Sequence, residues 1–286
     1  MTTDLSHFTA ACVQMQGTRS IDANIEAASA MIREAAKAGA DYVQTPEQTA
    51  IMELDTAKVF EQITAEADDR ALAAFRTLAA ELGIWLHIGS LAIRISETQG
   101  ANRAFVITPD GEIAARYDKI HMFDVDLPNG ETYRESKAYR PGTAAVVADL
   151  PWARFGLSIC YDIRFAYLYR ALAHAGASVL TAPAAFTKVT GEAHWHILQQ
   201  ARAIENGSFL ISAAQGGMHE NGRATYGHSL IVAPWGEILA EAGTEPGVIL
   251  AEIDLAKVDE ARGRVPSLTH DRSFQPPVAL QARRAS

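Results

Sequence analysis

The chain has 286 residues, of which 48% are hydrophobic and 21% charged, a composition typical of a globular protein with a sizeable core. Its formal net charge of -9 opposes contact with phosphate backbones and anionic lipids, so we expect neither nucleic acid nor a membrane as a partner. Two cysteines, an N-terminus without a basic and apolar leader, and no apolar run long enough to cross a bilayer predict a cytoplasmic protein with reduced thiols.

The first half of the chain alternates strand-like and helix-like segments. Ser20 is a suitable N-cap for the first helix, which carries apolar residues on one face and stops at Gly39. In chain order, we expect a strand at Phe8–Met15, the helix after Ser20, a short strand at Asp41–Thr45, a helix at Asp68–Leu82, a strand at Ile84–Ile95, and a hairpin with arms at Ala104–Thr108 and Glu112–Arg116.

The second half follows a similar order. We expect a strand at Phe155–Ile159 followed directly by a helix at Asp162–Ala175, then a strand at Ser178–Thr181, a helix at Glu192–Asn206, a strand at Phe209–Ala214 and a hairpin within Ser229–Ala240. From about Arg262 the chain is loop-like and rich in Pro and Arg, which favours a C-terminal arm over residues 262–286.

Two pairs of segments match between the halves. Ala38-Gly39-Ala40 resembles Ala175-Gly176-Ala177, and the hairpin Phe105–Ile113 resembles Leu230–Ile238. Small-residue turns can recur by chance, but two matches in the same order favour an internal pseudo-twofold repeat. Such a repeat predicts an α/β fold with two similar sheets face to face and helices outside. Because no linker interrupts the sequence, we expect a single domain over residues 1–286.

Cys160 is the first candidate for chemistry. It follows an apolar strand and precedes a predicted helix, and ligands of α/β proteins bind at the C-terminal ends of strands. Backbone N–H groups at a helix N-terminus can also stabilise a thiolate or an oxyanion. The alternative is a buried structural cysteine, which is a common fate of a free thiol. Cys12, inside an apolar strand, fits that core role better.

A cysteine nucleophile needs a group that accepts and returns a proton. His194 and His196 lie two positions apart on a predicted helix, so they point in different directions and make a poor metal pair. No Cys-x-x-Cys or His-Glu-x-x-His pattern occurs, and we expect neither a metal nor a cofactor. Glu47 and Lys119 each close a predicted strand and can converge with Cys160, although a surface acid and a solvated lysine remain possible readings.

At these residues the chain resembles the nitrilase, or carbon–nitrogen hydrolase, superfamily, from about Phe8 to Arg272. The segments that carry the resemblance are Thr45-Pro46-Glu47, Tyr117–Asp126, Glu135-Ser136-Lys137 with Pro141-Gly142, Ile159–Phe165, Gly191–Trp195, Ala201–Asn206 and Tyr226–Ser229. Any one of these segments is a weak signal, whereas all of them in this order are specific.

The resemblance implies a four-layer αββα sandwich and a homodimer or larger assembly. It also implies roles for four residues: Glu47 as general base, Lys119 as catalytic lysine, Cys160 as nucleophile, and Glu135 as a second glutamate beside the lysine. Within the superfamily, the segments Phe123–Asp126 and Glu135–Lys137 resemble the Nit-type amidases. That branch includes deaminated-glutathione amidases and omega-amidases, which implies a small amide substrate that carries a carboxylate.

The chain departs from the family pattern at three places. Ala166-Tyr167 replaces a usual Pro-Glu, Thr45 replaces an aromatic residue, and Thr181-Ala182-Pro183 replaces a Tyr-Pro pairing. The candidate substrate-binding residues are Arg164 and Arg202, which could hold a carboxylate, and Tyr161, Phe186, His194 and Trp195, which could line the pocket. Ordinary packing around the site is the alternative for each of them.

The sequence does not exclude several other functions. A nitrilase or an N-carbamoyl amino acid hydrolase would use the same catalytic residues. A binding protein without catalysis could be built on the same scaffold, although it would not need all four catalytic residue types. A redox-sensing cysteine is disfavoured because no second cysteine lies near Cys160 in sequence to resolve a sulfenate.

Overall fold

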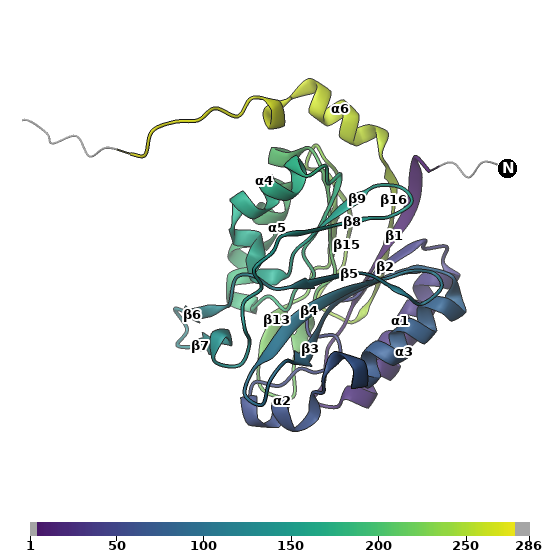
Figure 1. The fold of residues 1–286 in the computed structure, drawn as a ribbon, viewed down its shortest axis with the longest axis vertical. Helices are drawn as coiled ribbons and strands as arrows, with labels where there is room; N and C mark the ends of the chain where they lie inside the picture. The colour runs from purple at the N-terminus through teal and green to yellow at the C-terminus, as the bar shows by residue number, and fades with distance from the viewer. Residues whose placement is uncertain (1–4, 278–286) are drawn as a thin grey trace, which may run out of the picture.

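Two six-stranded sheets pack face to face in the computed structural model, which describes residues 5–277. Helices cover both outer faces (Figure 1). The first sheet contains, in order, β16 (Gly247–Asp254), β1 (His7–Gln14), β2 (Tyr42–Gln44), β3 (Trp85–Arg94), β4 (Gly100–Ile107) and β5 (Ile113–Asp118). The second contains β15 (Ile238–Glu241), β14 (Leu230–Val232), β11 (Phe209–Ser212), β10 (Val179–Thr181), β9 (Arg154–Leu157) and β8 (Val146–Asp149).

The two sheets are built on one plan. In the first, β1, β2 and β3 run parallel, an antiparallel pair β4–β5 follows, and β16 closes the other edge antiparallel to β1. In the second, β9, β10 and β11 run parallel, β14–β15 follows antiparallel, and β8 closes the edge. This correspondence confirms the predicted αββα sandwich with its internal repeat.

One pair of helices covers each sheet. Helices α1 (Ile21–Lys37) and α3 (Arg70–Leu82) lie on the first sheet, and α4 (Ala166–His174) and α5 (Lys188–Asn206) lie on the second (Figure 1). Ser20 caps α1 as predicted, because its side chain accepts a hydrogen bond from the N–H of Ala23. Gly83 ends α3 with a positive φ of 65°, a conformation that glycine adopts without steric cost.

Alternation along β1 divides its side chains between two cores. Ala11 and Val13 pack in the cluster under α1 and α3, whereas Ala10 and Cys12 pack in the cluster between the sheets. Phe155 of β9 meets Tyr42 of β2 in that second cluster, with ring centroids 5.0 Å apart. Cys12 is therefore a core residue, as its sequence position predicted.

Two predicted boundaries were wrong near the candidate site. Cys160 is not followed directly by an α-helix: a 3-10 turn, η3 (Cys160–Arg164), comes first and α4 starts only at Ala166. Helix α5 starts at Lys188, earlier than predicted. The elements without a sequence prediction are α2 (Thr56–Gln62), η1 (Glu66–Asp68), β6 (Asp124–Asp126), β7 (Thr132–Arg134), η2 (Glu135–Lys137), β8, β12 (Gly216–Met218), β13 (Ala224–Tyr226), β16, α6 (Ala256–Arg264) and η4 (Ser267–Thr269).

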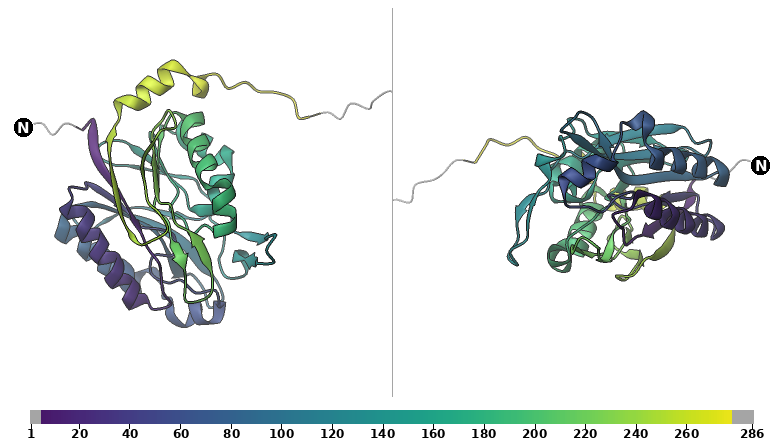
Figure 2. Two further views of the ribbon diagram at one scale, coloured as in Figure 1. Left: turned by 180° about the vertical axis from the view of Figure 1, so that it is seen from behind. Right: turned by 90° about the horizontal axis from the view of Figure 1, so that it is seen from below.

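The last described segment lies beyond the sandwich. Residues 262–264 of the predicted arm complete α6, and the segment after η4 extends away from the body (Figures 1 and 2). Residues 278–286 of that prediction lie outside the described residues. Within residues 5–277, every helix is too short or too polar to cross a bilayer.

Candidate active site

Four polar side chains meet at one edge of the sandwich, and each comes from the end of a different strand or turn. Glu47 follows β2, Lys119 follows β5, Glu135 opens η2 and Cys160 opens η3 after β9. Glu47, Lys119 and Cys160 are all buried. The structure therefore brings together the four residues that the sequence analysis proposed as catalytic, from both sheets.

Lys119 joins the two carboxylates. Its Nζ donates to Glu47 Oε1 at 2.7 Å, and to Glu135 Oε2 and Oε1 at 2.8 and 3.0 Å. Asn102 of β4 makes a second link, since its Nδ2 donates to Glu47 Oε1 and to Glu135 Oε1, both at 2.9 Å. Sequence reasoning missed Asn102, because nothing in a strand sequence indicates that one amide spans two distant acids.

Glu47 also reaches the thiol. Its Oε2 accepts a hydrogen bond from the N–H of Ala185 at 2.9 Å, and the carboxylate lies in hydrogen-bonding range of the Cys160 side chain. One carboxylate is therefore bonded to the ammonium and lies close enough to the thiol to shift its pKa. This is the arrangement that a proton acceptor for Cys160 requires.

The backbone of Cys160 is held in an unusual conformation. Its φ is +48°, which is rare for a residue with a side chain. Its N–H donates to Pro183 O at 2.9 Å. The buried Asp162 carboxylate secures the turn, because it accepts the N–H of Ile159 at 2.9 Å and the hydroxyl of Tyr117 at 2.7 Å. This fixed turn, rather than the N-terminus of α4, positions the sulfur.

The surroundings set opposite protonation states on the acid and the thiol. Burial raises the pKa of the Glu47 carboxyl, but the charge and hydrogen bond of Lys119 outweigh it, so the pKa falls below its usual value of 4.5. Burial, followed by the negative charge of Glu47, raises the pKa of the Cys160 thiol well above its usual 9.0. Burial disfavours the charged form of Lys119, yet Glu135 and Glu47 raise its pKa well above 10.5. At rest, an ionised carboxylate and an ammonium therefore face a neutral thiol.

These four side chains lie in the wall of a cavity of about 120 Å³. The β6–β7 hairpin, which projects from the body in Figure 1, and the segment before it contribute part of that wall. The larger apolar and aromatic lining residues are Leu54, Val59, Phe123, Tyr133, Tyr139, Tyr161 and Phe186. A reactive centre in such a cavity is shielded from bulk water, which strengthens its electrostatic interactions.

Residues 9–263 match the family described as carbon-nitrogen hydrolase. The chain belongs to the carbon–nitrogen hydrolase family.

Two relatives of this carbon–nitrogen hydrolase carry amidase names. A deaminated glutathione amidase of Synechocystis is 41% identical, over 92% of this chain and 97% of its own length. An omega-amidase of Homo sapiens is 37% identical, over 94% of this chain and 96% of its own length. These identities place the hydrolase among the amidases of its family.

Two solved structures share the fold. The C. elegans NitFhit protein superposes with a TM-score of 0.87 at 36% identity, covering 93% of this chain and 65% of that one. A mutant of the amidase from Nesterenkonia sp. AN1 superposes with a TM-score of 0.80 at 27% identity, covering 95% and 96%. In that amidase, the acetamide moiety of fluoroacetamide is added covalently at the active-site cysteine.

Of the six residues predicted to bind substrate, the structure places two in the cavity wall of the hydrolase, Tyr161 and Phe186. Arg164 lies behind them, with its guanidinium 5.1 Å from the centre of the Phe186 ring and 5.9 Å from that of Tyr161. His194 is exposed and its Nδ1 lies 3.3 Å from Arg164 Nη1. Arg164 and His194 therefore support the aromatic wall from outside.

Trp195 and Arg202 are core residues of the second sheet and its helices. The Nε1 of Trp195 donates to His228 O at 2.8 Å, and the ring is fully buried. Arg202 donates from Nε to Ile163 O at 2.8 Å and pairs with Glu205 at 2.9 Å. For these two, the contacts fit the packing alternative, because their polar groups are used within the protein; contact with substrate stays a prediction.

Arg223 is a cavity residue that the site prediction missed. It precedes β13, is buried, and donates from Nη2 to Ala185 O. Its Nε is buried without a hydrogen-bond partner among the described residues, and its guanidinium lies 5.3 Å from the centre of the Tyr133 ring. A buried cation with a spare donor in the cavity wall can bind an anionic group. In the sequence, Arg223 lies three positions before the segment Tyr226–Ser229 of the family resemblance, and no local pattern marks it.

The departures from the family pattern lie outside the cavity wall. Tyr167 is exposed on α4, and its hydroxyl contacts His121 Nε2 at 2.5 Å. Thr45 is buried, with its Oγ1 2.7 Å from Thr49 Oγ1. The third departure touches the site only through the backbone, since Pro183 O accepts the N–H of Cys160.

Proposed function

We propose that this carbon–nitrogen hydrolase is an amidase that cleaves the terminal amide of a small carboxylate-bearing substrate through a thioester on Cys160. The observation that carries the proposal is the Glu47 carboxylate, which accepts a 2.7 Å hydrogen bond from the Lys119 ammonium and lies with the buried Cys160 thiol in the wall of one cavity. The names of the two relatives, a deaminated glutathione amidase and an omega-amidase, support the substrate class.

In the acylation step, Glu47 accepts the thiol proton as the sulfur of Cys160 attacks the carbonyl carbon. The C–N bond of the tetrahedral intermediate then breaks, and Glu47 gives the proton to the departing nitrogen, so ammonia leaves. The lowered pKa of Glu47 and the raised pKa of Cys160 keep the acceptor ionised and the donor protonated before substrate arrives.

The negative oxygen of the intermediate needs donors that are already in place. The Lys119 ammonium is one, held by Glu47 and Glu135. The backbone N–H of Tyr161 is the other, and it makes no hydrogen bond to another described residue. A preorganised donor of this kind is typically worth on the order of 3 kcal/mol in the transition state.

Hydrolysis of the thioester repeats the sequence with water. Glu47 takes a proton from the water molecule, the hydroxide oxygen attacks the thioester carbon, and the C–S bond breaks. The proton returns from Glu47 to sulfur as the acid product leaves. One buried carboxylate therefore serves as base and acid in both half-reactions.

Arg223 is the proposed partner of the substrate carboxylate. Its guanidinium lies in the cavity wall, and Ala185 connects it to the reacting centre, since Ala185 O accepts from Arg223 and Ala185 N–H donates to Glu47. A carboxylate on Arg223 would orient the opposite, amide end of a short substrate toward Cys160.

The reaction class is tested by ammonia release from deaminated glutathione, 2-oxoglutaramate, succinamate, simple aliphatic amides, nitriles and N-carbamoyl amino acids. The expected result is turnover of carboxylate-bearing amides by the parent protein and none by Cys160→Ala. A preference for nitriles or carbamoyl compounds would contradict the proposal that the substrate is an amide. Activity of Cys160→Ala would refute the nucleophile.

The role of Arg223 is tested with a matched pair of substrates, succinamate and butanamide. Arg223→Gln is expected to raise KM for succinamate by roughly 10- to 100-fold, because a charge-assisted hydrogen bond is lost. Butanamide has no carboxylate, so its KM should change far less. Equal losses on both substrates would contradict a carboxylate-binding role.

We further propose that the protein is a cytoplasmic homodimer or larger homo-oligomer. Exposed apolar side chains on α4 and α5, those of Tyr167, Ile197 and Ile204, support self-association. The cytoplasmic location is supported by the two cysteines, which are both free thiols, as expected in a reducing compartment. Light scattering after gel filtration is expected to give at least twice the mass of the chain. A monomer at micromolar concentration would contradict the assembly.

A further inference from the structure

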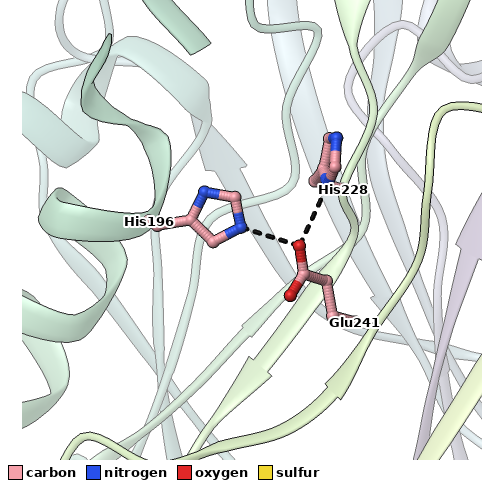
Figure 3. A group of neighbouring side chains, drawn as sticks. All are labelled: His196, His228 and Glu241. Atoms are coloured by element: carbon pink, nitrogen blue, oxygen red, sulfur yellow. Dashed lines mark hydrogen bonds and ion pairs between the residues drawn. The ribbon is translucent and has the colours of Figure 1, made fainter. Parts of the chain in front are cut away.

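A second cluster of chemically active side chains lies away from the cavity. His196 comes from α5, His228 from the link between β13 and β14, and Glu241 from the end of β15 (Figure 3). His196 Nε2 lies 2.8 Å and His228 Nδ1 lies 2.9 Å from the same oxygen, Glu241 Oε1. One ligand-type atom from each residue lies within 4.8 Å of the others.

The donor set and its spacing suit a metal ion. Two imidazole nitrogens and one carboxylate oxygen are a common ligand set for zinc, with a fourth position left to water. Bonds of about 2.0–2.1 Å in tetrahedral geometry put neighbouring ligand atoms about 3.3 Å apart. The two N–O distances here need to open by only about half an ångström to reach that value. The metal would take the place of the two N–H protons that now point at Glu241.

The imidazole of His228 is held in place before any ion arrives. Its backbone N–H donates to Gly243 O and its carbonyl accepts from the Trp195 indole, each at 2.8 Å. Its ring stacks on Tyr226 with centroids 4.2 Å apart and an interplanar angle of 24°. The ring of His196 meets the same tyrosine edge-on at 5.9 Å. Ligands fixed in this way lose little freedom on binding.

The cluster is open to solvent on one side. The side chains of His196, His228 and Glu241 are 29%, 24% and 36% exposed, so an ion can enter and a water can complete the coordination. A simple ion pair needs one imidazole for the carboxylate, whereas here two imidazoles from separate elements converge on one oxygen. Figure 3 shows both rings with a nitrogen directed at that oxygen.

We propose that His196, His228 and Glu241 bind a divalent transition-metal ion, of the zinc type, at a site separate from the catalytic cavity. The ion would fasten α5 to the β14–β15 hairpin. Helix α5 also carries Thr190, and His228 follows Arg223 by only five positions; Thr190 and Arg223 both line the cavity. The metal would therefore stiffen one wall of the cavity without contacting substrate.

The test uses the full chain with Cys160→Ala, so that the reactive thiol cannot bind metal. After treatment with a chelator, Zn²⁺ is titrated in competition with a chromophoric chelator, and thermal unfolding is followed with and without Zn²⁺. The expected result is one Zn²⁺ per chain and a rise in Tm with Zn²⁺, because an ion that binds only the folded state stabilises it.

Three variants in this background identify the ligands. His196→Gln, Glu241→Gln and His228→Asn are each expected to weaken Zn²⁺ binding by roughly tenfold or more and to abolish the rise in Tm. Asparagine suits position 228 because it tolerates the positive φ of 54° there. His194→Gln, which removes another histidine of α5 outside the cluster, is the matched control and should bind Zn²⁺ like the parent.

Two results would overturn the proposal. One is the absence of saturable Zn²⁺ binding by the Cys160→Ala protein. The other is unchanged Zn²⁺ affinity in Glu241→Gln and His228→Asn. If one histidine variant does not fold, its circular dichroism will show this, and Glu241→Gln, which keeps the shape of the side chain, decides the outcome.

Discussion

At the scale of single residues, the site depends on where Glu47 directs its two oxygens. Oε1 accepts from Lys119 and Asn102, and Oε2 accepts from the N–H of Ala185. The negative charge of the carboxylate also raises the pKa of the Cys160 thiol. Each donor stabilises the ionised carboxylate, which would otherwise be costly to bury. A proton transfer from Cys160 then creates no new buried charge, since a thiolate replaces a carboxylate.

Removing the charge of Glu47 separates its role in proton transfer from its role in packing. Glu47→Gln is expected to lower kcat/KM by roughly 10²- to 10⁴-fold, the usual contribution of a general base. Alkylation of Cys160 by iodoacetamide at neutral pH should slow as well, because the thiol loses its proton acceptor. Cys12 is fully buried and should not react in the native protein. Unchanged alkylation would contradict the role of Glu47 as base.

The same carboxylate sets the acid limit of activity. The pKa of Glu47 lies below 4.5, so the carboxylate stays ionised as the pH falls from neutrality and is protonated only below that value. We expect kcat/KM to fall with an apparent pKa under 4.5, and any stability that the ionised Glu47 contributes to be lost over the same range. A pH profile of kcat/KM checks this, and an acid limb near pH 6.5 would instead point to a histidine.

Some residues of the two sites could be predicted from the sequence, and others could not. Glu47, Lys119 and Cys160 could be picked out because each stands at the end of a predicted strand, where side chains of α/β proteins converge. Arg223 and Asn102 have no such marker, since their neighbours in space come from distant segments. His196 was compared with its near neighbour His194, whereas the fold pairs it with His228 and Glu241.

At the scale of elements, a close approach of strands fixes the distance between the acid and the thiol. Gly89 sits at the bulge of β3, where its N–H donates to Thr45 Oγ1 at 3.1 Å. A Cβ atom there would lie 2.1 Å from Thr45 O and 2.5 Å from Pro183 Cβ. Thr45 leads to Glu47, and Pro183 O accepts the N–H of Cys160, so Gly89 lets the two catalytic segments meet.

A side chain at position 89 should lower both the free energy of unfolding and the catalytic rate. Gly89→Ala is expected to lower the free energy of unfolding by about 1–3 kcal/mol or more, because two backbone segments must move apart. Urea unfolding measures the loss, and kcat should fall with it. Gly263→Ala in α6 is the control, since a Cβ there meets nothing within 4 Å. Equal stability of the two variants would show that the strands yield without cost.

Helices and strands could be predicted where apolar residues recur at a regular spacing and a capping residue or glycine marks the end of the element. Helices α1 and α3 followed from apolar spacing, with Ser20 and Gly83 at their ends. The turn after Cys160 was missed because its hydrogen bonds come from Asp162 and Tyr117, which a local pattern does not indicate. The edge strand β16 has mostly half-buried side chains and no contrast between its faces, so its periodicity gave little signal.

At the scale of the whole molecule, the two halves share one core. Phe8 and Tyr42 of the first sheet pack in the same cluster as Phe155, Leu180 and Leu210 of the second. Neither sheet could keep its inner face covered without the other (Figure 2). We therefore propose that the predicted single domain unfolds as one unit despite its internal repeat.

Calorimetry tests this cooperativity. A single transition is expected, with a calorimetric enthalpy equal to the van't Hoff enthalpy, because separation of the sheets would expose the shared apolar core. Cys160→Ala should show the same single transition at a similar Tm, as a control for oxidation during heating. Two resolved transitions would indicate that the halves are independent folding units.

The pairing of β1 with β16 has a consequence for synthesis of the chain. His7 of β1 lies opposite Asp254 and Gln14 lies opposite Gly247, so β1, the first described strand, cannot pair with β16 until more than 230 further residues have been synthesised. Until translation has passed Asp254, one edge of the first sheet exposes unsatisfied N–H and C=O groups. During that interval the nascent chain is a target for chaperones and for mispairing with neighbouring copies on the same polysome.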